Sequence, residues 1–342
     1  MKAAKKIIIC TLLGVLLQNL IFLYVEKIYL GGESNYNIQK VDNTANSKSL
    51  KTNISENAED IRTSYDGKYI SYMDNGKLIV CNYKDESKNE YKEASGKIEY
   101  YKWLTDCNKI IVIEKMIENG DTYFVPISYD AKTNKINELT DFDRNEVKIK
   151  SSSLGAKVVS VAFSTVSSSL YINIEEDGMN NLYYANQMNQ IEKVRSNENI
   201  GNIAVPTTSS NVIMEESNKI FDLSKNNNLE IPSENNPRIL GADKDDKVYL
   251  YNDNNGKTDT IYYANLSEKS YRWNEIKLKS EEDIKNIFLD YSGKIYINNP
   301  SKKTANEIIS GKEIKYEGDL IGSYSEGVIS KNGNEIIKND LE

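Results

Sequence analysis

The chain has 342 residues, with 51 acidic and 43 basic side chains, a formal charge of −8, three cysteines and no histidine. The lack of histidine excludes Ser-His-Asp and Cys-His catalysis and the usual zinc sites. The acidic balance argues against nucleic acid as a partner, because phosphates are held by clustered Lys and Arg.

An uncharged segment, residues 7–25, follows Lys2, Lys5 and Lys6. A helix of this length spans the roughly 30 Å hydrocarbon core of a bilayer, and lysines ahead of it stay cytoplasmic. We therefore expect residues 1–30 to be a cytoplasmic stub and a single-pass transmembrane signal-anchor in the lipid bilayer, with the remaining chain extracytoplasmic. The alternatives are a cleaved signal peptide, although no Ala-x-Ala site follows, and a lipid at Cys10, although isoleucines rather than small residues precede it.

Two amides, Gln18 and Asn19, lie in the middle of the predicted span. Such groups can hydrogen-bond a neighbouring helix, and they can also simply be tolerated in a span of sufficient length. Both interpretations stay open, and the first makes Gln18 and Asn19 candidate transmembrane contacts.

Residues 31–60 are polar and predict a linker before the folded domain. Residues 1–30 carry a net charge of +3, so −11 falls on residues 31–342. The Asn- and Ser-rich middle of the linker cannot bury a core. Residues 37–41 are the exception, because their short alternation is typical of a strand.

From Ile61 onward, apolar and polar residues alternate with period two between Asn, Asp and Gly turns, which predicts β-strands. The Asn75-Gly76 pair between two alternating runs is a strong hairpin signal. No helical period is sustained after the span, so the domain at 61–342 is predicted to be all-β.

A strand–turn–strand unit recurs along this domain. Its clearest copy is Ser64–Tyr72, and Trp103–Val112 and Leu289–Ile297 are weaker copies. Spacings near 40–50 residues are typical of β-propeller blades. The Ser64–Tyr72 motif resembles TolB-type and WD40-like propeller repeats and the propeller domain of dipeptidyl-peptidase IV relatives, although Tyr65 stands where the family usually has Pro. The resemblance implies a propeller without the hydrolase domain of those peptidases.

The spacing predicts six to eight blades, with seven preferred. The last unit, 319–342, has three strands and lacks a fourth. Residues 37–41 are predicted to supply it, because pairing both chain ends closes the ring and leaves no exposed sheet edge.

No motif predicts a catalytic, cofactor or metal site. Asn252–Asp259 resembles a calcium loop, but its spacing puts tyrosines at the first and twelfth ligand positions, so a hairpin turn is expected. The Asp243–Asp246 segment is also expected to be a turn, with a weak cation as the alternative. Cys81, in an apolar run, is expected to be a buried thiol.

The 24 tyrosines suggest two interpretations. Tyrosine supplies rigid contact area at binding surfaces, and it is also a favoured strand residue. Three pairs are candidate binding-face aromatics: Tyr100, Tyr101, Tyr183, Tyr184, Tyr262 and Tyr263. Trp103 and Trp273 are expected to pack between blades.

The sequence thus predicts a membrane-anchored extracytoplasmic β-propeller that acts as a non-catalytic binding or scaffolding module for a protein, peptide or small ligand. One alternative is a carboxylate- or Tyr-based carbohydrate-active or lyase-like enzyme in the propeller channel. Another is a membrane sensor or complex subunit.

Overall fold

The computed structural model describes residues 18, 22, 50–141, 143–232, 236–268 and 270–341. The chain divides into two units, Met1–Asn46 and Ser47–Glu342. In the first unit, Gln18 and Phe22 are described, and both are helical and exposed. No helix in the described part of the chain is long and apolar enough to cross a membrane.

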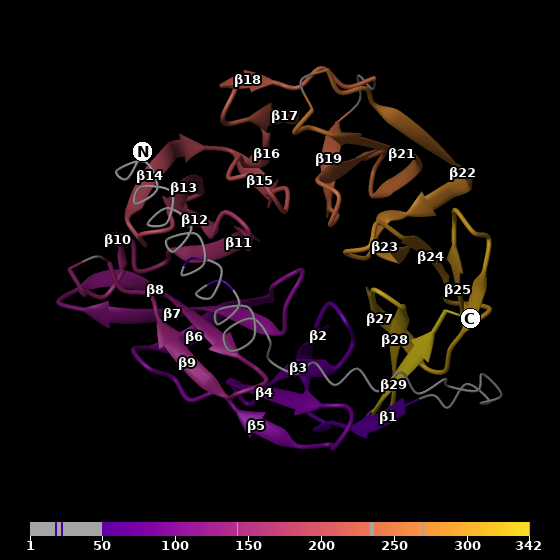
Figure 1. Ribbon diagram of the computed structural model, residues 1–342, viewed down its shortest axis with the longest axis horizontal. Helices are drawn as coiled ribbons and strands as arrows, with labels where there is room; N and C mark the ends of the chain where they lie inside the picture. Colours follow the sequence, from indigo (N-terminus) through magenta and orange to yellow (C-terminus); the bar gives the residue numbers. More distant parts are fainter. Residues whose placement is uncertain are drawn as a thin grey trace, which may run out of the picture. The chain divides into compact units, whose positions relative to one another are not determined.

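The described residues of the second unit form seven antiparallel sheets arranged as blades around a common centre (Figure 1). The all-β prediction and the preferred count of seven blades are confirmed. Blade 1 holds β2 (Glu59–Thr63), β3 (Tyr69–Asp74), β4 (Lys77–Asn82) and β5 (Lys88–Glu90). Blade 2 holds β6 (Lys97–Trp103), β7 (Lys109–Glu118), β8 (Asp121–Asp130), β9 (Lys135–Glu138) and β10 (Ile149–Ser151). Blade 3 holds β11 (Lys157–Ser164), β12 (Ser169–Glu176), β13 (Met179–Ala185) and β14 (Ile191–Glu198).

The other blades follow the same order. Blade 4 holds β15 (Ile200–Ala204), β16 (Ile213–Glu216), β17 (Lys219–Asp222) and β18 (Asn227–Asn228). Blade 5 holds β19 (Pro237–Ala242), β20 (Lys247–Asn252), β21 (Lys257–Asn265) and β22 (Asn274–Asp283), and a short 3-10 turn, η2 (Ile284–Asn286), leads on. Blade 6 holds β23 (Ile287–Leu289), β24 (Ile295–Asn299), β25 (Thr304–Glu307) and β26 (Glu313–Lys315). Blade 7 holds β27 (Asp319–Tyr324), β28 (Gly327–Asn332), β29 (Glu335–Asp340) and β1 (Leu50–Asn53).

The second and third strands of several blades are joined by two-residue turns that the sequence signals. Asn75 and Gly76 have φ values of 50° and 80° between β3 and β4. Positive φ at both central residues is the requirement of the type I′ hairpin turn, which Asn-Gly meets at low strain. The turns at Asn119-Gly120 and Asp177-Gly178 have the same signs of φ.

The ring is closed by a strand from the N-terminal side of the chain. β1 pairs antiparallel with β29, in register Leu50 with Lys338 through Asn53 with Glu335. The strand beside β29 is therefore Leu50–Asn53 rather than residues 37–41, which lie outside the described residues. Thr52 is the buried side chain of β1, so this edge strand carries little apolar signal.

Blade 2 has five strands, whereas each of the other six described sheets has four. β10 pairs with β8, and its partner Phe124 is fully buried. Residues 149–151 therefore belong to blade 2 rather than to blade 3, which follows them in the sequence. Because β8 has ten residues, it pairs with β9 along one half and with β10 along the other.

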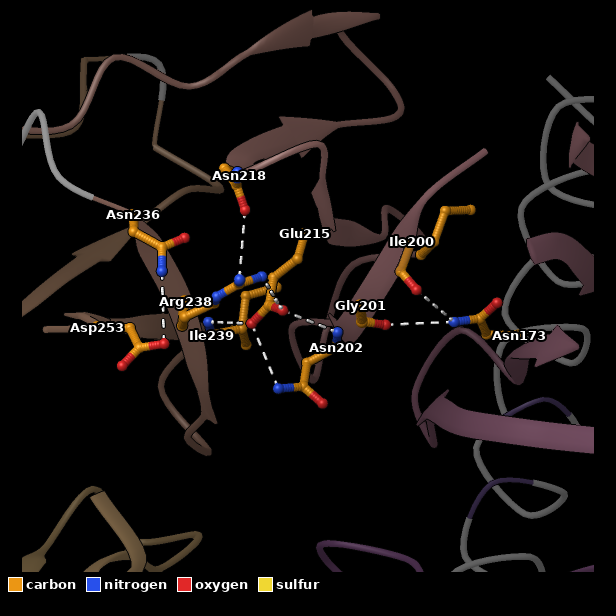
Figure 2. Close-up of polar contacts among 10 residues, drawn as sticks. All are labelled: Asn173, Ile200, Gly201, Asn202, Glu215, Asn218, Asn236, Arg238, Ile239 and Asp253. Carbon is orange, nitrogen blue, oxygen red and sulfur yellow. Dashed lines mark hydrogen bonds and ion pairs between the residues drawn. The ribbon is translucent and has the colours of Figure 1, made fainter. Parts of the chain in front are cut away.

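Buried polar side chains of second strands hold neighbouring blades together. Glu215 of β16 accepts hydrogen bonds from the Ile239 N–H of blade 5 at 2.7 Å and from the Asn202 N–H of its own blade at 3.1 Å (Figure 2). The Asn202 N–H is free because β15 has a bulge between Ile200 and Ile203. Glu114 of β7 likewise accepts from the N–H groups of residues 94–96 at 2.6–2.9 Å.

Apolar side chains fill the spaces between blades. Trp103 of blade 2 is buried, stacks on Tyr69 of blade 1 at 6.2 Å between ring centroids and donates to Ser71 Oγ at 2.7 Å. Trp273 of blade 5 packs in a cluster shared with blade 4 and donates to the Glu230 carbonyl at 2.8 Å. Both tryptophans therefore pack between blades, as expected.

Candidate binding recess

The loops between first and second strands define one end of the ring, which we call face 1. Because neighbouring strands are antiparallel, the loops between third and fourth strands lie at the same end, and the hairpin turns described above lie at the opposite end, face 2. The face 1 loops between first and second strands are residues 64–68, 104–108, 165–168, 205–212, 243–246, 290–294 and 325–326.

The central channel forms a cavity of about 260 Å³ toward face 1. Its wall comes from the ends of the first strands of blades 2 to 6, namely β6, β11, β15, β19 and β23. Most of the lining side chains are apolar: Leu104, Ile111, Val161, Ala162, Phe163, Ile203, Ala204, Val205, Leu240, Ala242 and Leu289. The polar side chains in the lining include Lys102, Asp290 and Tyr291.

A groove of about 460 Å³ lies between blades 2 and 3 on the same face. Its floor is apolar and includes Leu139, Leu170 and Ala185. Its rim is polar, with Asn186, Gln187 and Asn189 on the blade 3 side. The Asn189 amide donates to the Thr140 carbonyl at 2.8 Å, which ties the outer ends of the two blades together.

The channel cavity and the groove adjoin each other. Leu104, Ile111 and Phe163 line both of them. Val166 and Met188, in the two face 1 loops of blade 3, are 63% and 62% exposed. We call the cavity, the groove and these two side chains the recess. Hollows with apolar walls and exposed apolar side chains in neighbouring loops are typical of interaction sites.

Lys102 is the basic side chain that lines the channel cavity. Its ammonium donates to the Val161 carbonyl on the neighbouring first strand at 2.8 Å. Burial, together with the neighbouring Arg62 charge, lowers the pKa of Lys102 from its usual 10.5 to about 8. Arg62 has its own partners, because it donates to Asp60 Oδ1 at 2.8 Å and to the Tyr101 carbonyl. Lys102 has no ion pair within the described part of the chain.

Hydroxyl groups span the channel end of the recess. The Tyr291 hydroxyl of blade 6 donates to Thr207 Oγ1 of blade 4 at 3.2 Å, and so reaches past blade 5. Burial raises the pKa of Tyr291, which keeps this hydroxyl protonated. On the groove side, Thr165 donates to Asp106 Oδ2.

Two carboxyl groups near the channel occupy equivalent positions in neighbouring blades. Asp243 accepts from the Lys247 N–H at 3.0 Å and from the Tyr249 hydroxyl at 2.8 Å. Asp290 accepts from the Lys294 N–H at 3.0 Å, while its Oδ2 and the Tyr296 hydroxyl are buried without partners in the described residues. Burial raises the pKa of Asp290. Both aspartates therefore shape their turns, six residues ahead of a tyrosine.

The two predicted turns are turns in the structure. Asn252–Asp259 contains the β20–β21 connection, with positive φ at Asn255 and Gly256. Asp243–Asp246 joins β19 to β20, and Asp246 accepts hydrogen bonds from the Thr208 N–H at 2.8 Å and from the Thr208 hydroxyl. Among the residues that the structure describes, no cluster of three or more metal-ligating side chains occurs.

The six candidate tyrosines are not brought together, since the pairs lie in blades 2, 3 and 5. Tyr101, Tyr183 and Tyr262 are buried. The other three are partly buried: Arg62 lies over Tyr100, Tyr184 stacks on Tyr171, and Tyr263 stacks on Tyr249. Their packing corresponds to the alternative interpretation, tyrosine as a strand residue.

The other predicted side chains are placed as follows. Gln18 is helical and exposed, whereas Asn19 lies outside the described residues. Cys81 is buried, as expected, and its thiol and that of Cys107 are both free. Burial and the neighbouring Asp106 carboxylate raise the pKa of Cys107 to about 11, so this groove thiol is protonated at neutral pH.

Sequence reasoning did not find the recess. Lys102 lies in an alternating strand, where it has the pattern of a solvent-facing lysine, and only the ring places it in a channel. Val166 and Met188 lie in polar loops and belong to no apolar period. A search for apolar residues within predicted turns is the signal that would have pointed to them.

Comparison with known proteins supports the fold. No family model and no curated protein matches the sequence. The β-propeller domain of Cps50 (Swd1) from Myceliophteria thermophila is similar in structure, with a TM-score of 0.53 and 9% identity over 87% of this chain and 100% of that one. Dipeptidyl peptidase 4 of Porphyromonas gingivalis gives a TM-score of 0.48 and 12% identity over 81% of this chain, which spans only 50% of that protein.

Proposed function

We propose that this chain is a membrane-anchored, extracytoplasmic and non-catalytic binding module that holds a protein or peptide partner in the recess of face 1. The observation that carries the proposal is that the channel cavity and the groove between blades 2 and 3 lie side by side and share part of their lining. Their shared apolar wall and the exposed Val166 and Met188 give a partner an apolar anchor point.

The proposed membrane location rests on residues 7–25 of the sequence, with Lys2, Lys5 and Lys6 ahead of them. It is tested by digesting intact cells with a protease that cannot enter. The ring should be degraded and the N-terminal stub protected. A ring that resists until the cells are lysed contradicts the proposed location.

The proposed lack of catalysis is supported by the missing histidine and by the tyrosines near the channel. A tyrosine acts as a base only when it can ionise, and burial raises the pKa of Tyr291 instead. The enzymatic alternative has one observation in its favour, the raised pKa of the Asp290 carboxyl, which is a property of general acids. Turnover of a carbohydrate panel that is lost in Asp290→Asn would favour that alternative.

Binding at face 1 is tested by site-specific photocrosslinking of the full chain in intact cells. A photoreactive residue at Val166 or Met188 should capture a partner. The matched control is Ile117, which is 63% exposed but lies at the end of β7 on face 2. Capture from Ile117 with none from Val166 or Met188 would contradict a face 1 site.

The sensor alternative depends on the predicted span. Replacing Gln18 and Asn19 by Leu should abolish association with a partner helix if the span is the contact. Under the proposal above, the same double substitution leaves crosslinking from Val166 unchanged.

A further inference from the structure

The channel cavity combines an apolar wall with one unpaired positive charge. Val161, Leu240 and Leu289, from three different blades, contribute to the wall. The Lys102 ammonium has three protons and one acceptor in the described residues, the Val161 carbonyl. Burying a charge without an opposite partner is unfavourable, so such a group is a candidate for a ligand of opposite charge.

A second positive charge, that of Arg62, acts on Lys102. Arg62 lies on the first strand of blade 1, next to β6. The Asp60 carboxylate pairs with Arg62, and no carboxylate pairs with Lys102 in the described part of the chain. Two like charges on neighbouring strands of a channel are stabilised by an anion between or beside them.

At the face 1 end of the cavity, a polar side chain favours an anion only if it has a free hydrogen-bond donor. The Tyr291 hydroxyl already donates to Thr207 Oγ1 at 3.2 Å, and the Thr207 hydroxyl donates to the Asp243 carbonyl at 3.1 Å. The Asp290 carboxylate already accepts from its own turn. The acidic group of a ligand is therefore expected beside Lys102 rather than at the face 1 end of the cavity.

From these contacts we infer that the channel cavity binds an apolar ligand that ends in a carboxylate, with the carboxylate on Lys102 and the apolar part against the walls. This deepens the proposed function, on which it rests, by naming the ligand chemistry of the recess. Two sources supply that chemistry: a small free acid, and the C-terminal carboxylate of a peptide whose last side chain is apolar.

The test uses the full chain in detergent and two matched probe pairs, measured by isothermal titration calorimetry. Phenylacetate is compared with phenylacetamide, and the peptide Gly-Ser-Gly-Val-Phe is compared with its C-terminally amidated form. We expect the acid of at least one pair to bind at least tenfold more tightly than its amide. Binding of phenylacetate identifies a free acid as sufficient, whereas binding of the peptide alone identifies a peptide terminus.

Two variants assign the effect to the residue. Lys102→Met should abolish binding of the acids without loss of folding, because it removes a half-buried charge and keeps the stem volume. Lys97→Met, at the exposed start of the same strand and outside the recess, should bind as the wild type does. Equal binding of acid and amide, unchanged binding in Lys102→Met, or no binding of either acid overturns the inference.

Failure of this inference and failure of the proposed function can be told apart. A partner captured at Val166 or Met188 while neither acid binds leaves the binding module intact and removes only the carboxylate. Binding of an acid with no partner captured at face 1 retains the cavity and contradicts the protein or peptide partner.

Discussion

At the scale of single residues, the surroundings of Lys102 disfavour the charged form of its side chain. The ammonium contacts one carbonyl oxygen, and its pKa is lowered to about 8. A lowered lysine pKa means that the charged form is less stable in the folded chain than in the unfolded chain. Lys102 therefore destabilises the ring at neutral pH. Ligand binding explains the presence of a lysine at this position more readily than stability of the fold does.

The first prediction concerns the stability of Lys102→Met. At pH 7 we expect the substitution to stabilise the ring by about 1–3 kcal/mol, since each pKa unit corresponds to about 1.4 kcal/mol and local relaxation reduces the total. The gain should be full below pH 8, shrink as the pH rises from 8 toward 10.5, and vanish above it. Thermal unfolding of the full chain at several pH values measures it. Destabilisation at pH 7 would show that the lysine stem, not its charge, matters.

The second prediction concerns Glu215, the carboxylate in Figure 2 that joins blades 4 and 5. Glu215→Ala leaves the buried Ile239 N–H without its 2.7 Å acceptor and deprives Arg238 of a partner at 3.3 Å. An unsatisfied buried donor costs about 1–3 kcal/mol, so the melting temperature should fall by several degrees.

Two other variants interpret the Glu215 result. Glu215→Gln keeps an acceptor oxygen and should lower the melting temperature less than Ala does. Glu192→Ala, on the exposed face of β14, should leave it unchanged. An equal fall in Gln and Ala would assign the stabilisation to the charge rather than to the hydrogen bonds.

At the scale of elements, β1 shows how a strand of four residues completes a blade. It contributes one buried side chain, Thr52, and main-chain pairing to β29. Next to it, the Ile54 N–H donates to the Asn334 carbonyl at 2.8 Å, and the Ile54 side chain is buried between blades 7 and 1. The strand is thus held mainly by its backbone.

The third prediction separates this strand from the segment before it. Deleting residues 31–53 removes β1 and should destabilise the ring by about 2–4 kcal/mol, at about 1 kcal/mol for each ladder hydrogen bond. Deleting residues 31–45 keeps β1 and should leave the melting temperature within about one degree of the wild type, as small surface changes do. A large fall in the second variant would give residues 37–41 a structural role.

The elements also mark the limit of what the sequence can predict. Strands with central apolar residues and Asn-Gly turns, such as β3 and β4, follow from local chemistry, so the blade order was predictable. β1 and β10 were missed because an edge strand needs only one or two buried side chains. The recess was missed for a different reason. Lys102 and Phe163 line the same cavity only because the blades are arranged in a ring, and no local sequence pattern encodes that arrangement.

At the scale of the whole molecule, the two ends of the ring are neighbours. Leu50 pairs with Lys338, and both lie toward face 1. The unbroken order β1-β29-β28-β27 makes blade 7 equivalent to the other four-stranded blades, except that its outer strand comes from the distant end of the chain.

The fourth prediction uses this neighbourhood. Moving residues 48–53 to the C-terminus, after a two-residue Asn-Gly turn following Asp340, should let β29 and β1 form an ordinary hairpin that keeps Leu50 opposite Lys338. The rearranged full chain is expected to unfold within a few degrees of the wild type, because every strand pair is kept. A chain carrying Pro at positions 51 and 53 of the moved segment is the control, and it should resemble the 31–53 deletion. If the rearranged chain does not fold, blade 7 is not equivalent to the other four-stranded blades.

The pairing of β1 with β29 also sets an order of events during synthesis. Lys51 and its partner Glu335 are separated by 284 positions, so the first strand in the described part of the chain is paired with the last one. Blades 1 to 6 can assemble as they emerge, but β1 has no partner until blade 7 is complete. Throughout that interval β1 is unpaired, so closure of the ring is expected to be the last step of folding.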